Sequence, residues 1–461
     1  MITALLLFTL FFLLCFQLTK KSLWSQLRIP EVHGIPIVGN LLPVVLKKKS
    51  YFETIEDLYK LGEGKDYIGI YNGTQPTLLI RNPDLVEILI KEEAKNFEDR
   101  GLCSDLSDPL SLNLFFLKGK LWKWTRAKLR PAFSNIRLKT VFNGIELCTA
   151  DCVNSFGSSV DIKEVMDEYT CNVIAKNVFC VQDNTGFIEN SLKVFSLSGL
   201  SGIAVLLRVF IPNFALSIGI KTVPQEIETF YRNAIAKSTR VPGSFLDLML
   251  HLKETEPDFS DDLMVAQFFI FILAGFETTS SALTYALYLL SKNPDAQNKA
   301  RFEAQKVFKE HGRSIDSLKK LTFLEGIINE TLRLYPSVTG MFRVAEKPFK
   351  LPCGAVLPAG TAISVPIYCL HRDPRFYEDP LKFIPERWEM PQKVFYPFGL
   401  GPRLCIGMKF ALLEMKIFLS SVILKYNIKL NNATVEPLSF DPTSFFYKAI
   451  NPILLDFEKT V

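Results

Sequence analysis

Hydrophobic residues recur at helical spacing over most of the chain, from about Pro83 to Leu334. Within this region the apolar stretch FFIFILAGF predicts one long helix from about Asp262 to Lys292. Two stretches are β-like instead, namely Tyr67–Arg81, which we interpret as a hairpin, and Phe349–Pro366. The sequence from about Asn427 onward looks similar to them. The pattern therefore predicts a mainly α fold with small peripheral β-sheets.

The N-terminus has a different pattern, because no charged residue occurs between Met1 and Leu18 and basic residues follow. A helix needs about 17–25 apolar residues to span a bilayer. A cleaved signal peptide would carry positive charge before its apolar stretch, and positive charge after the stretch favours a cytosolic body. We predict a membrane anchor over residues 1–19, a Pro/Gly-rich connector over 20–40 and one folded domain over 41–461. The alternative is a buried N-terminal helix.

The composition excludes few functions. The 461 residues carry a net charge of +5, which by itself indicates no nucleic-acid partner. The nine cysteines are dispersed, without a CxxC pair or a zinc-like cluster, as in proteins of a reducing compartment. A second apolar segment, Gly199–Val223, is broken by Arg208 and Pro212 and is therefore either core or a flap that enters the membrane surface.

One cysteine stands in an unusual setting. Cys405 lies in the stretch FGLGPRLCIG, from Phe398 to Gly407, with Arg403 two residues before it. Glycine and proline around a single thiol predict a tight turn that presents or protects the sulfur. The alternative is a buried, inert thiol.

An acid and an alcohol interrupt the long apolar helix. Glu277 and Thr278 belong to the stretch AGFETTS, and burying such a pair is costly unless it has partners. An acid and a hydroxyl together can hold a water molecule and relay protons. The alternative is a polar stripe that faces solvent.

Two further patterns combine charges with aromatic residues. The stretches ETLR and FIPERW supply Glu330, Arg333 and Arg387, which could tie a helix to a loop. In WKWTR, Trp122 and Arg126 are four residues apart, inside a segment without acidic residues. That segment is either a solvated basic face or a surface that binds anionic groups.

Together these motifs resemble the cytochrome P-450 family, the haem-thiolate monooxygenases. The matching stretches are WKWTR, AGFETT, ETLR, PERW and FGLGPRLCIG, in the order found in that family. The stretches NFEDRG, DPLSLNLF and HRDP further resemble the animal microsomal group, which includes insect detoxifying enzymes and mammalian drug-metabolising enzymes. The resemblance implies a cytochrome P-450 fold over 41–461, preceded by one transmembrane helix.

The resemblance also implies site residues. Cys405 would be the axial thiolate ligand of the iron of haem b, and Glu277 and Thr278 would deliver protons during the reaction with O2. The loop beneath the haem would include Phe398, Gly401 and Gly407. The partners of the haem propionates would be Arg403, Trp122, Arg126 and Arg343, with His371 as a weaker candidate. The substrate pocket would draw on the flap and on Phe115, Phe116, Phe269, Phe445 and Phe446.

The partners follow from what the sequence lacks. It has no G-x-G-x-x-G motif after a strand and no P-loop, so no nicotinamide or flavin site is evident. The resemblance implies electrons from NADPH and flavins through a separate NADPH-dependent flavoprotein reductase. This reductase would dock on a basic face near Lys123, Lys128, Arg130 and Lys409. The substrate would be an apolar small molecule, xenobiotic or lipid-like, and the protein would be a single-pass endoplasmic reticulum protein facing the cytosol.

Two alternatives stay open. One is a haem-thiolate isomerase that needs no reductase, against which the Glu277–Thr278 pair argues. The other is a degenerate haem-binding membrane protein. The main support for this second alternative is the segment Trp388–Tyr396, which is shorter than the family's usual segment before the cysteine. The segment Asn233–Asp262 is also shorter than usual for the family.

Overall fold

The computed structural model describes residues 22–460, except 103, 106, 182–184, 194–217, 222 and 445. The helices are α2 (Leu23–Gln26), α3 (Leu42–Val45), α4 (Tyr51–Leu61), α5 (Pro83–Glu87), α6 (Gly119–Leu129), α7 (Asn135–Asn154), α8 (Ile162–Val173), α9 (Phe187–Lys193), α12 (Gln225–Lys237), α13 (Phe245–Thr255), α14 (Asp261–Lys292), α15 (Pro294–His311), α16 (Ile315–Leu318), α17 (Thr322–Leu334), α18 (Ile367–Leu370) and α19 (Met408–Lys425). The strands are β1 (Tyr67–Asn72), β2 (Gln75–Ile80), β3 (Ser159–Asp161), β4 (Met341–Val344), β5 (Phe349–Lys350), β6 (Val356–Leu357), β7 (Ala362–Val365), β8 (Tyr426–Leu430) and β9 (Leu454–Lys459). The predicted mainly α fold with small sheets is confirmed.

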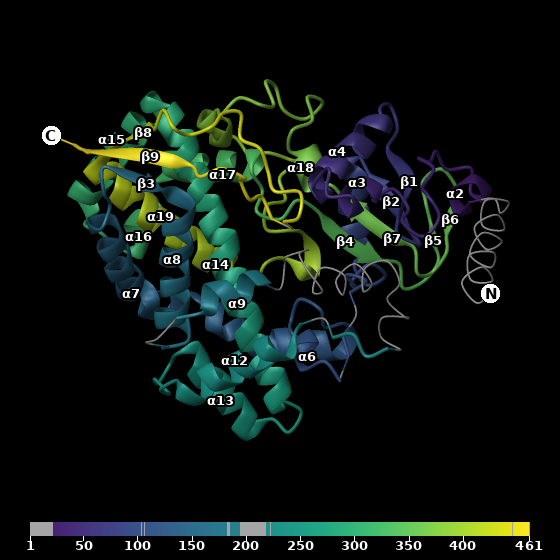
Figure 1. Cartoon of the computed structure of the whole chain (residues 1–461), viewed down its shortest axis with the longest axis horizontal. Coiled ribbons are helices and arrows are strands. Elements are labelled where there is room, and N and C mark those ends of the chain that lie inside the picture. Colours follow the sequence, from purple (N-terminus) through teal and green to yellow (C-terminus); the bar gives the residue numbers. More distant parts are fainter. Residues whose placement is uncertain are drawn as a thin grey trace, which may run out of the picture.

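Helix α14 runs through the helical part of the molecule and positions the candidate site (Figure 1). Ser260 caps it by accepting the N–H of Leu263 at 3.1 Å, and Pro294 starts the next helix directly after its end. Its side chains are buried on nearly all faces, as in a core helix. Among the described residues it is the one helix long and apolar enough to cross a membrane, but 78% of its apolar window is buried inside the protein. The predicted long helix is therefore a core helix.

The strands form three small sheets (Figure 1). The largest has the order β1-β2-β7-β4, and its first two strands are the predicted hairpin, with Tyr67 opposite Ile80. A second sheet, β3-β9-β8, joins the C-terminus to the helical part. Strand β3 was not predicted, because three residues are too few to show an alternation. Its pairing comes from β9, where Val160 lies opposite Leu455.

The described part of the predicted connector lies against the largest sheet. Trp24, in α2, is fully buried, and its indole N–H donates to the carbonyl of Ile70 at 3.1 Å. The predicted anchor, residues 1–19, lies outside the described residues, as does most of the apolar segment Gly199–Val223. Both therefore stay predictions.

Candidate functional site

The cysteine loop is a tight turn, as predicted, between a short 3-10 helix (Gly401–Arg403) and α19. The N–H of Cys405 donates to the carbonyl of Phe398 at 2.9 Å, which closes the turn. Gly401 has a φ of +69°, and a Cβ there would lie 2.2 Å from the carbonyl oxygen of Ile90. The chain's own packing therefore requires glycine at this position. A Cβ on Gly407 would meet Phe133 only at 3.8 Å, so packing leaves that position open.

Cys405 is accessible although protein surrounds it. The residue is exposed, yet burial is the main cause that raises the pKa of its thiol. A residue can be both accessible and surrounded by protein atoms when its side chain borders a space inside the fold. The backbone N–H groups of Gly407 and Met408 and the charges of Arg126 and Arg100 act in the opposite direction and lower this pKa. These groups favour a thiolate at the N-terminus of α19.

Four arginines gather near this thiol. Burial lowers the pKa of Arg100, and the charges of Arg343, Arg403 and Arg126 lower it further. Burial also lowers the pKa values of Arg343 and Arg403, each to about 10. The guanidinium of Arg403 lies 3.9 Å from the centre of the buried Trp122 ring, and that of Arg126 lies 5.8 Å from it. Two of the predicted basic residues, Arg126 and Arg403, therefore lie at one tryptophan, and the charge of Arg343 acts on Arg403.

These arginines donate their hydrogen bonds to backbone carbonyls and not to carboxylates. Arg126 donates to the carbonyl of Leu404 at 2.6 Å, and Arg403 donates to that of Leu117 at 2.7 Å. Arg343 donates to the carbonyl of its neighbour Phe342. Among the residues that the structure describes, no carboxylate lies within ion-pair distance of any of the four arginines. The charges of Asp99 and Glu98 offset those of Arg343 and Arg403 only in part, so the cluster is suited to an anionic ligand.

Sequence reasoning missed Arg100. It belongs to the stretch NFEDRG, where two acidic residues precede it and suggest an ordinary surface ion pair. The structure turns it inward instead: its guanidinium donates to the carbonyl of Phe115 at 3.0 Å and lies 4.1 Å from the ring centre of that residue. Only the fold brings Arg100 to the other three arginines.

The acid and the alcohol of α14 point to different surroundings. Glu277 is buried and accepts hydrogen bonds from Lys163 of α8 at 3.2 and 3.3 Å. The hydroxyl of Thr278 donates to the carbonyl of Ala274 at 2.7 Å, and both of these residues retain exposed surface although they lie in the middle of a core helix. Gly275 leaves room for the side chain of Ile174, because a Cβ at position 275 would lie only 2.6 Å from the Cδ1 of Ile174. Ala274 and Thr278 thus form an accessible strip in the middle of α14, and Glu277 is the neighbour of Thr278 in the chain.

Lys163 is shared by two carboxylates. It forms an ion pair with Asp167 as well as with Glu277, and Asp167 also accepts the hydroxyl of Ser280. One cation cannot fully stabilise two buried anions. Burial therefore raises the pKa of Glu277 to about 7, although Lys163 opposes the shift. A carboxyl group with this pKa exchanges its proton near neutral pH.

The comparisons with known proteins agree with this geometry. The family model described as "Cytochrome P450" matches residues 29–457. The chain belongs to the cytochrome P450 family. It is 32% identical to cytochrome P450 6j1 of Blattella germanica, over 95% of this chain and 93% of that protein. It is 30% identical to cytochrome P450 3A13 of Mus musculus, over 95% and 92%, and 29% identical to probable cytochrome P450 6g2 of Drosophila melanogaster, over 93% and 92%.

Membership confirms the predicted family and enzyme class: this P450 is a haem-thiolate monooxygenase, and its cofactor is haem b. The residues present fit that group. An accessible thiol next to a helix N-terminus suits an iron ligand, and four arginines that form no ion pair within the described residues suit the two propionate carboxylates of a haem. The mixture of insect and mammalian relatives agrees with the predicted animal group.

The predicted clasp of this P450 is confirmed. Glu330 and Arg333 are fully buried and form two hydrogen bonds, of 2.8 and 2.9 Å, and Arg387 reaches the same carboxylate at 3.2 Å. Trp388, which sequence reasoning did not assign to the clasp, donates its indole N–H to Glu330 at 3.1 Å. Trp388 also packs on Phe395, with ring centres 4.2 Å apart. The short segment before the cysteine is therefore braced at both ends.

His371, the weaker candidate for a propionate partner, lies in different surroundings from the arginine cluster. It is fully buried, and its Nε2 accepts the N–H of Tyr396 at 2.9 Å. Burial and the charge of Arg333 lower its pKa to about 3, so the imidazole is neutral. The structure therefore places His371 as a support of the short segment, and not as a charged partner of an anion.

The aromatic candidates for the substrate pocket differ in accessibility. Phe115 is exposed and lies beside Phe116, with ring centres 5.9 Å apart. Phe269 is 1% exposed and packs on Tyr231, so it belongs to the core. Phe446 is buried as well, and position 445 lies outside the described residues.

Proposed function

We propose that this P450 inserts one oxygen atom from O2 into an apolar small molecule, xenobiotic or lipid-like, with electrons from a separate NADPH-dependent flavoprotein reductase. Residues 1–19 anchor it in the endoplasmic reticulum membrane, and its body faces the cytosol. The observation that carries the proposal is Cys405 together with four nearby arginines that form no ion pair within the described residues. When bound, the haem supplies the oxidising chemistry, which its thiolate ligand promotes.

Each site residue has a proposed role. Cys405 is the axial ligand, and the backbone N–H groups of Gly407 and Met408 stabilise negative charge on its sulfur. Phe398 and Gly401 fix the loop that carries it. The propionate partners are Arg100, Arg126, Arg343, Arg403 and Trp122. Arg100 extends the predicted set.

Glu277 and Thr278 are proposed to move protons to the accessible strip of α14. Thr278 has one hydroxyl hydrogen, which its bond to Ala274 occupies, so its oxygen is left to accept a hydrogen bond from water. Glu277 must turn away from Lys163 to reach that strip. When Glu277 turns away, Lys163 keeps its ion pair with Asp167. Lys163 is therefore a positioning residue, which binds the Glu277 carboxylate between proton transfers.

We expect Glu277→Gln to lower the rate of product formation by about 100-fold, because general acid–base groups contribute factors of this order. In the unsubstituted protein the rate should fall as the pH rises through about 7, where Glu277 loses its proton. The variant should lose this pH dependence. Rates measured from pH 6 to 8.5 provide the test, with the exposed Glu310→Gln as the control. An unchanged profile in Glu277→Gln would remove Glu277 from the proton route.

The raised pKa also predicts the sign of a stability effect. The folded state holds the Glu277 proton more tightly than the unfolded state, so the contribution of this carboxyl group is most favourable at low pH. That contribution is lost as the pH rises from about 4.5 to about 7. Thermal unfolding of Glu277→Gln should therefore depend less on pH across this interval than unfolding of the unsubstituted protein.

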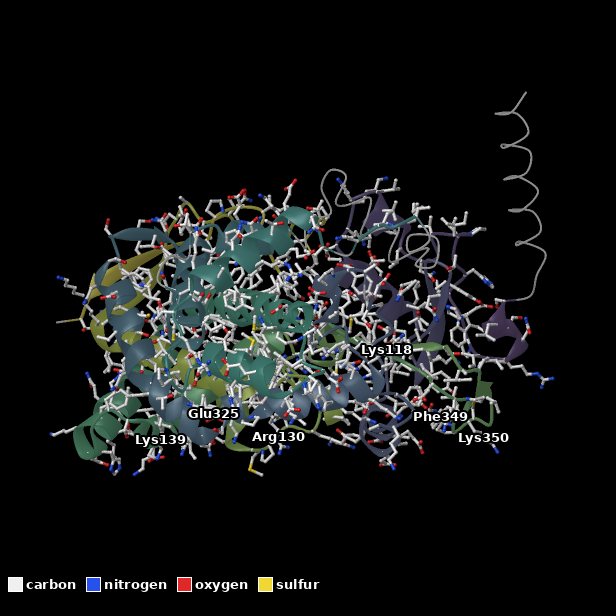
Figure 2. The ribbon with its side chains drawn as sticks, turned by 90° about the horizontal axis from the view of Figure 1, so that it is seen from below. Lys118, Arg130, Lys139, Glu325, Phe349 and Lys350 are labelled. Carbon is white, nitrogen blue, oxygen red and sulfur yellow. The ribbon has the colours of Figure 1, made fainter. Side chains whose placement is uncertain are left out.

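The reductase is proposed to dock on the basic face. Figure 2 shows Lys118, Arg130 and Lys139 spread across one face of the molecule. Lys123 and Lys128 are already paired with acids, at 3.2 and 2.5 Å. Arg130 has no acid within ion-pair distance in the described part of the chain, so it offers more unpaired charge to an acidic partner than they do.

Substrate-dependent consumption of NADPH with added reductase tests the function. A reductase-dependent monooxygenase should consume NADPH faster when substrate and reductase are both present than with either one alone, and the rate should fall with salt because the docking is electrostatic. A haem-thiolate isomerase would rearrange a peroxide without NADPH. A degenerate haem protein would do neither, and either result would replace the proposed function.

A further inference from the structure

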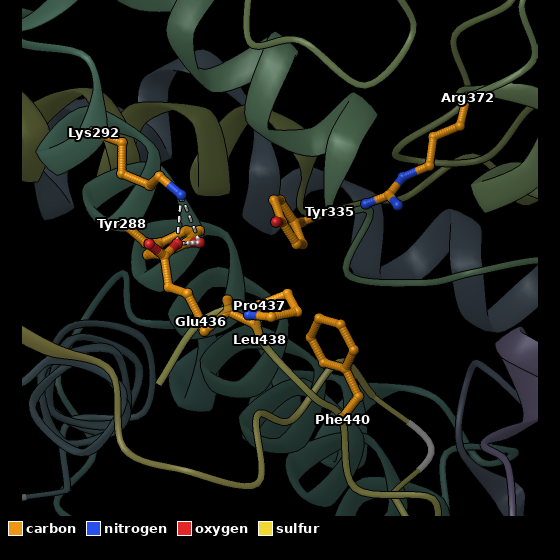
Figure 3. Close-up of a pocket in the computed structure, with 8 residues that line it drawn as sticks. All are labelled: Tyr288, Lys292, Tyr335, Arg372, Glu436, Pro437, Leu438 and Phe440. Carbon is orange, nitrogen blue, oxygen red and sulfur yellow. Dashed lines mark hydrogen bonds and ion pairs between the residues drawn. The ribbon is translucent and has the colours of Figure 1, made fainter. Parts of the chain in front are cut away.

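A cavity of about 470 Å³ lies at the surface, and none of its lining residues has been given a role above. It is formed by the last turns of α14, the end of α17, the turn after α18 and the loop between β8 and β9 (Figure 3). Its volume is within the range of small-molecule sites. The lining residues are Tyr288, Lys292, Tyr335, Arg372, Glu436, Pro437, Leu438 and Phe440.

One side of this cavity is electrically balanced. Lys292 forms an ion pair with Glu436, and the hydroxyl of Tyr288 donates to the same carboxylate oxygen (Figure 3). Hydrogen bonds from both partners lower the pKa of Glu436, so this carboxyl group is ionised at neutral pH. The pair neither needs nor strongly attracts a further charge.

The other side carries a cation that forms no ion pair within the described residues and lies over the rings of Tyr335 and Tyr368, at 5.4 and 4.1 Å from their centres. Arg372 donates its Nε–H to the carbonyl of Leu334 at 2.9 Å and one Nη1–H to the hydroxyl of Tyr368 at 2.6 Å, and its Nη2 donates to the same carbonyl as Nε. A guanidinium has five N–H donors, so two remain after these bonds. No carboxylate within the described ranges lies at ion-pair distance from Arg372. Figure 3 shows its guanidinium directed at Tyr335, on the opposite side from Lys292.

Aromatic and apolar groups lie between the two charged sides. The ring of Tyr335 stacks on Tyr285 of α14, with centres 4.5 Å apart and an interplanar angle of 8°, so its position is fixed. Phe440 packs edge-on against Tyr447, at 5.0 Å, and faces the cavity with Leu438. A flat apolar body suits these walls.

We propose that this cavity binds a small aromatic monocarboxylate. The carboxylate lies on the free N–H groups of Arg372, and the ring lies between Tyr335 and Phe440. The lining carries two cations and one anion, which favours a ligand with one negative charge over a cation or a neutral molecule. This proposal does not depend on the reaction proposed for the haem site.

Equilibrium dialysis of the haem-loaded protein against 2-naphthoate and its neutral analogue 2-naphthalenemethanol tests this site. We expect naphthoate to bind at least about tenfold more tightly, because hydrogen bonds from a guanidinium to a carboxylate are stronger than those to a neutral hydroxyl. Arg372→Gln should remove that preference. Lys299→Gln, which neutralises an exposed cation outside the cavity, should retain it.

A second variant keeps the test decisive if Arg372→Gln does not fold. Leu438→Asp adds a negative charge to the cavity wall and should also abolish the preference for naphthoate. Equal affinities of the two probes in the unsubstituted protein would overturn the proposal. So would a preference that survives Leu438→Asp, because the carboxylate would then bind elsewhere, for example in the haem site.

Discussion

Replacing Cys405 with alanine should abolish the strongly red-shifted absorption band that the reduced protein gives with carbon monoxide. The sulfur of Cys405 lies next to the N-terminus of α19, where the backbone N–H groups of Gly407 and Met408 are directed at it. Replacing a residue that only hydrogen-bonds to a metal ligand already lowers metal affinity or activity by about 10–100-fold. Loss of the ligand itself should therefore lower haem retention and product formation by more than about 100-fold.

Cys353→Ala is the matched control, because Cys353 is also an exposed cysteine but lies in a turn between β5 and β6. Its spectrum and activity should equal those of the unsubstituted protein. A red-shifted band that persists in Cys405→Ala would mean that another residue ligates the iron. Haem bound only with the unshifted band in the unsubstituted protein would mean that the thiolate is lost, and would favour the degenerate alternative.

The sequence predicted the parts of the site that are local in the chain. The loop Phe398–Gly407 and the helix of Glu277 each carry their chemistry and their turn or helix signals within a short stretch, so spacing alone identifies them. The clasp was also predictable in part, because Glu330 and Arg333 are three residues apart on one helix face.

The parts that depend on packing were not predictable. Lys163 meets Glu277 across 114 residues of chain, through the contact of α8 with α14, and nothing in its own neighbourhood signals that contact. Arg100 turns inward because the carbonyl of Phe115 receives it. Phe269 looked like a pocket residue, but α14 is buried on nearly all faces, so most of its aromatic residues are core.

The site is therefore assembled between distant segments. Arg403, two residues before the cysteine, donates to the carbonyls of Leu117 and Glu98, and so joins the cysteine loop to the segment that carries Arg100. The proposed propionate partners Arg126 and Arg403 thus connect separate loops through their hydrogen bonds to backbone carbonyls. We infer that an anion adds charge compensation to loops that are already positioned.

Removing the clasp carboxylate should produce the largest loss of stability. Glu330 is fully buried and accepts five hydrogen bonds: two from Arg333 and one each from Arg387, Trp388 and the N–H of Ile384. Glu330→Ala leaves two guanidinium groups in the interior without their anion. Breaking a buried ion pair from one side costs about 3–5 kcal/mol, so we expect a loss of at least this size in the free energy of unfolding.

Urea unfolding, followed by haem absorbance and by tryptophan fluorescence, measures this loss. The exposed Glu310→Ala should change stability by less than about 0.5 kcal/mol, as surface substitutions do. A Glu330→Ala midpoint equal to that of the control would show that the clasp contributes no stability. Arg333 also donates to the carbonyl of His371, which supports Tyr396, so the haem signal should be lost at lower urea than the fluorescence signal. Coincident transitions would instead show that the clasp holds the whole fold, and not only the short segment before the cysteine.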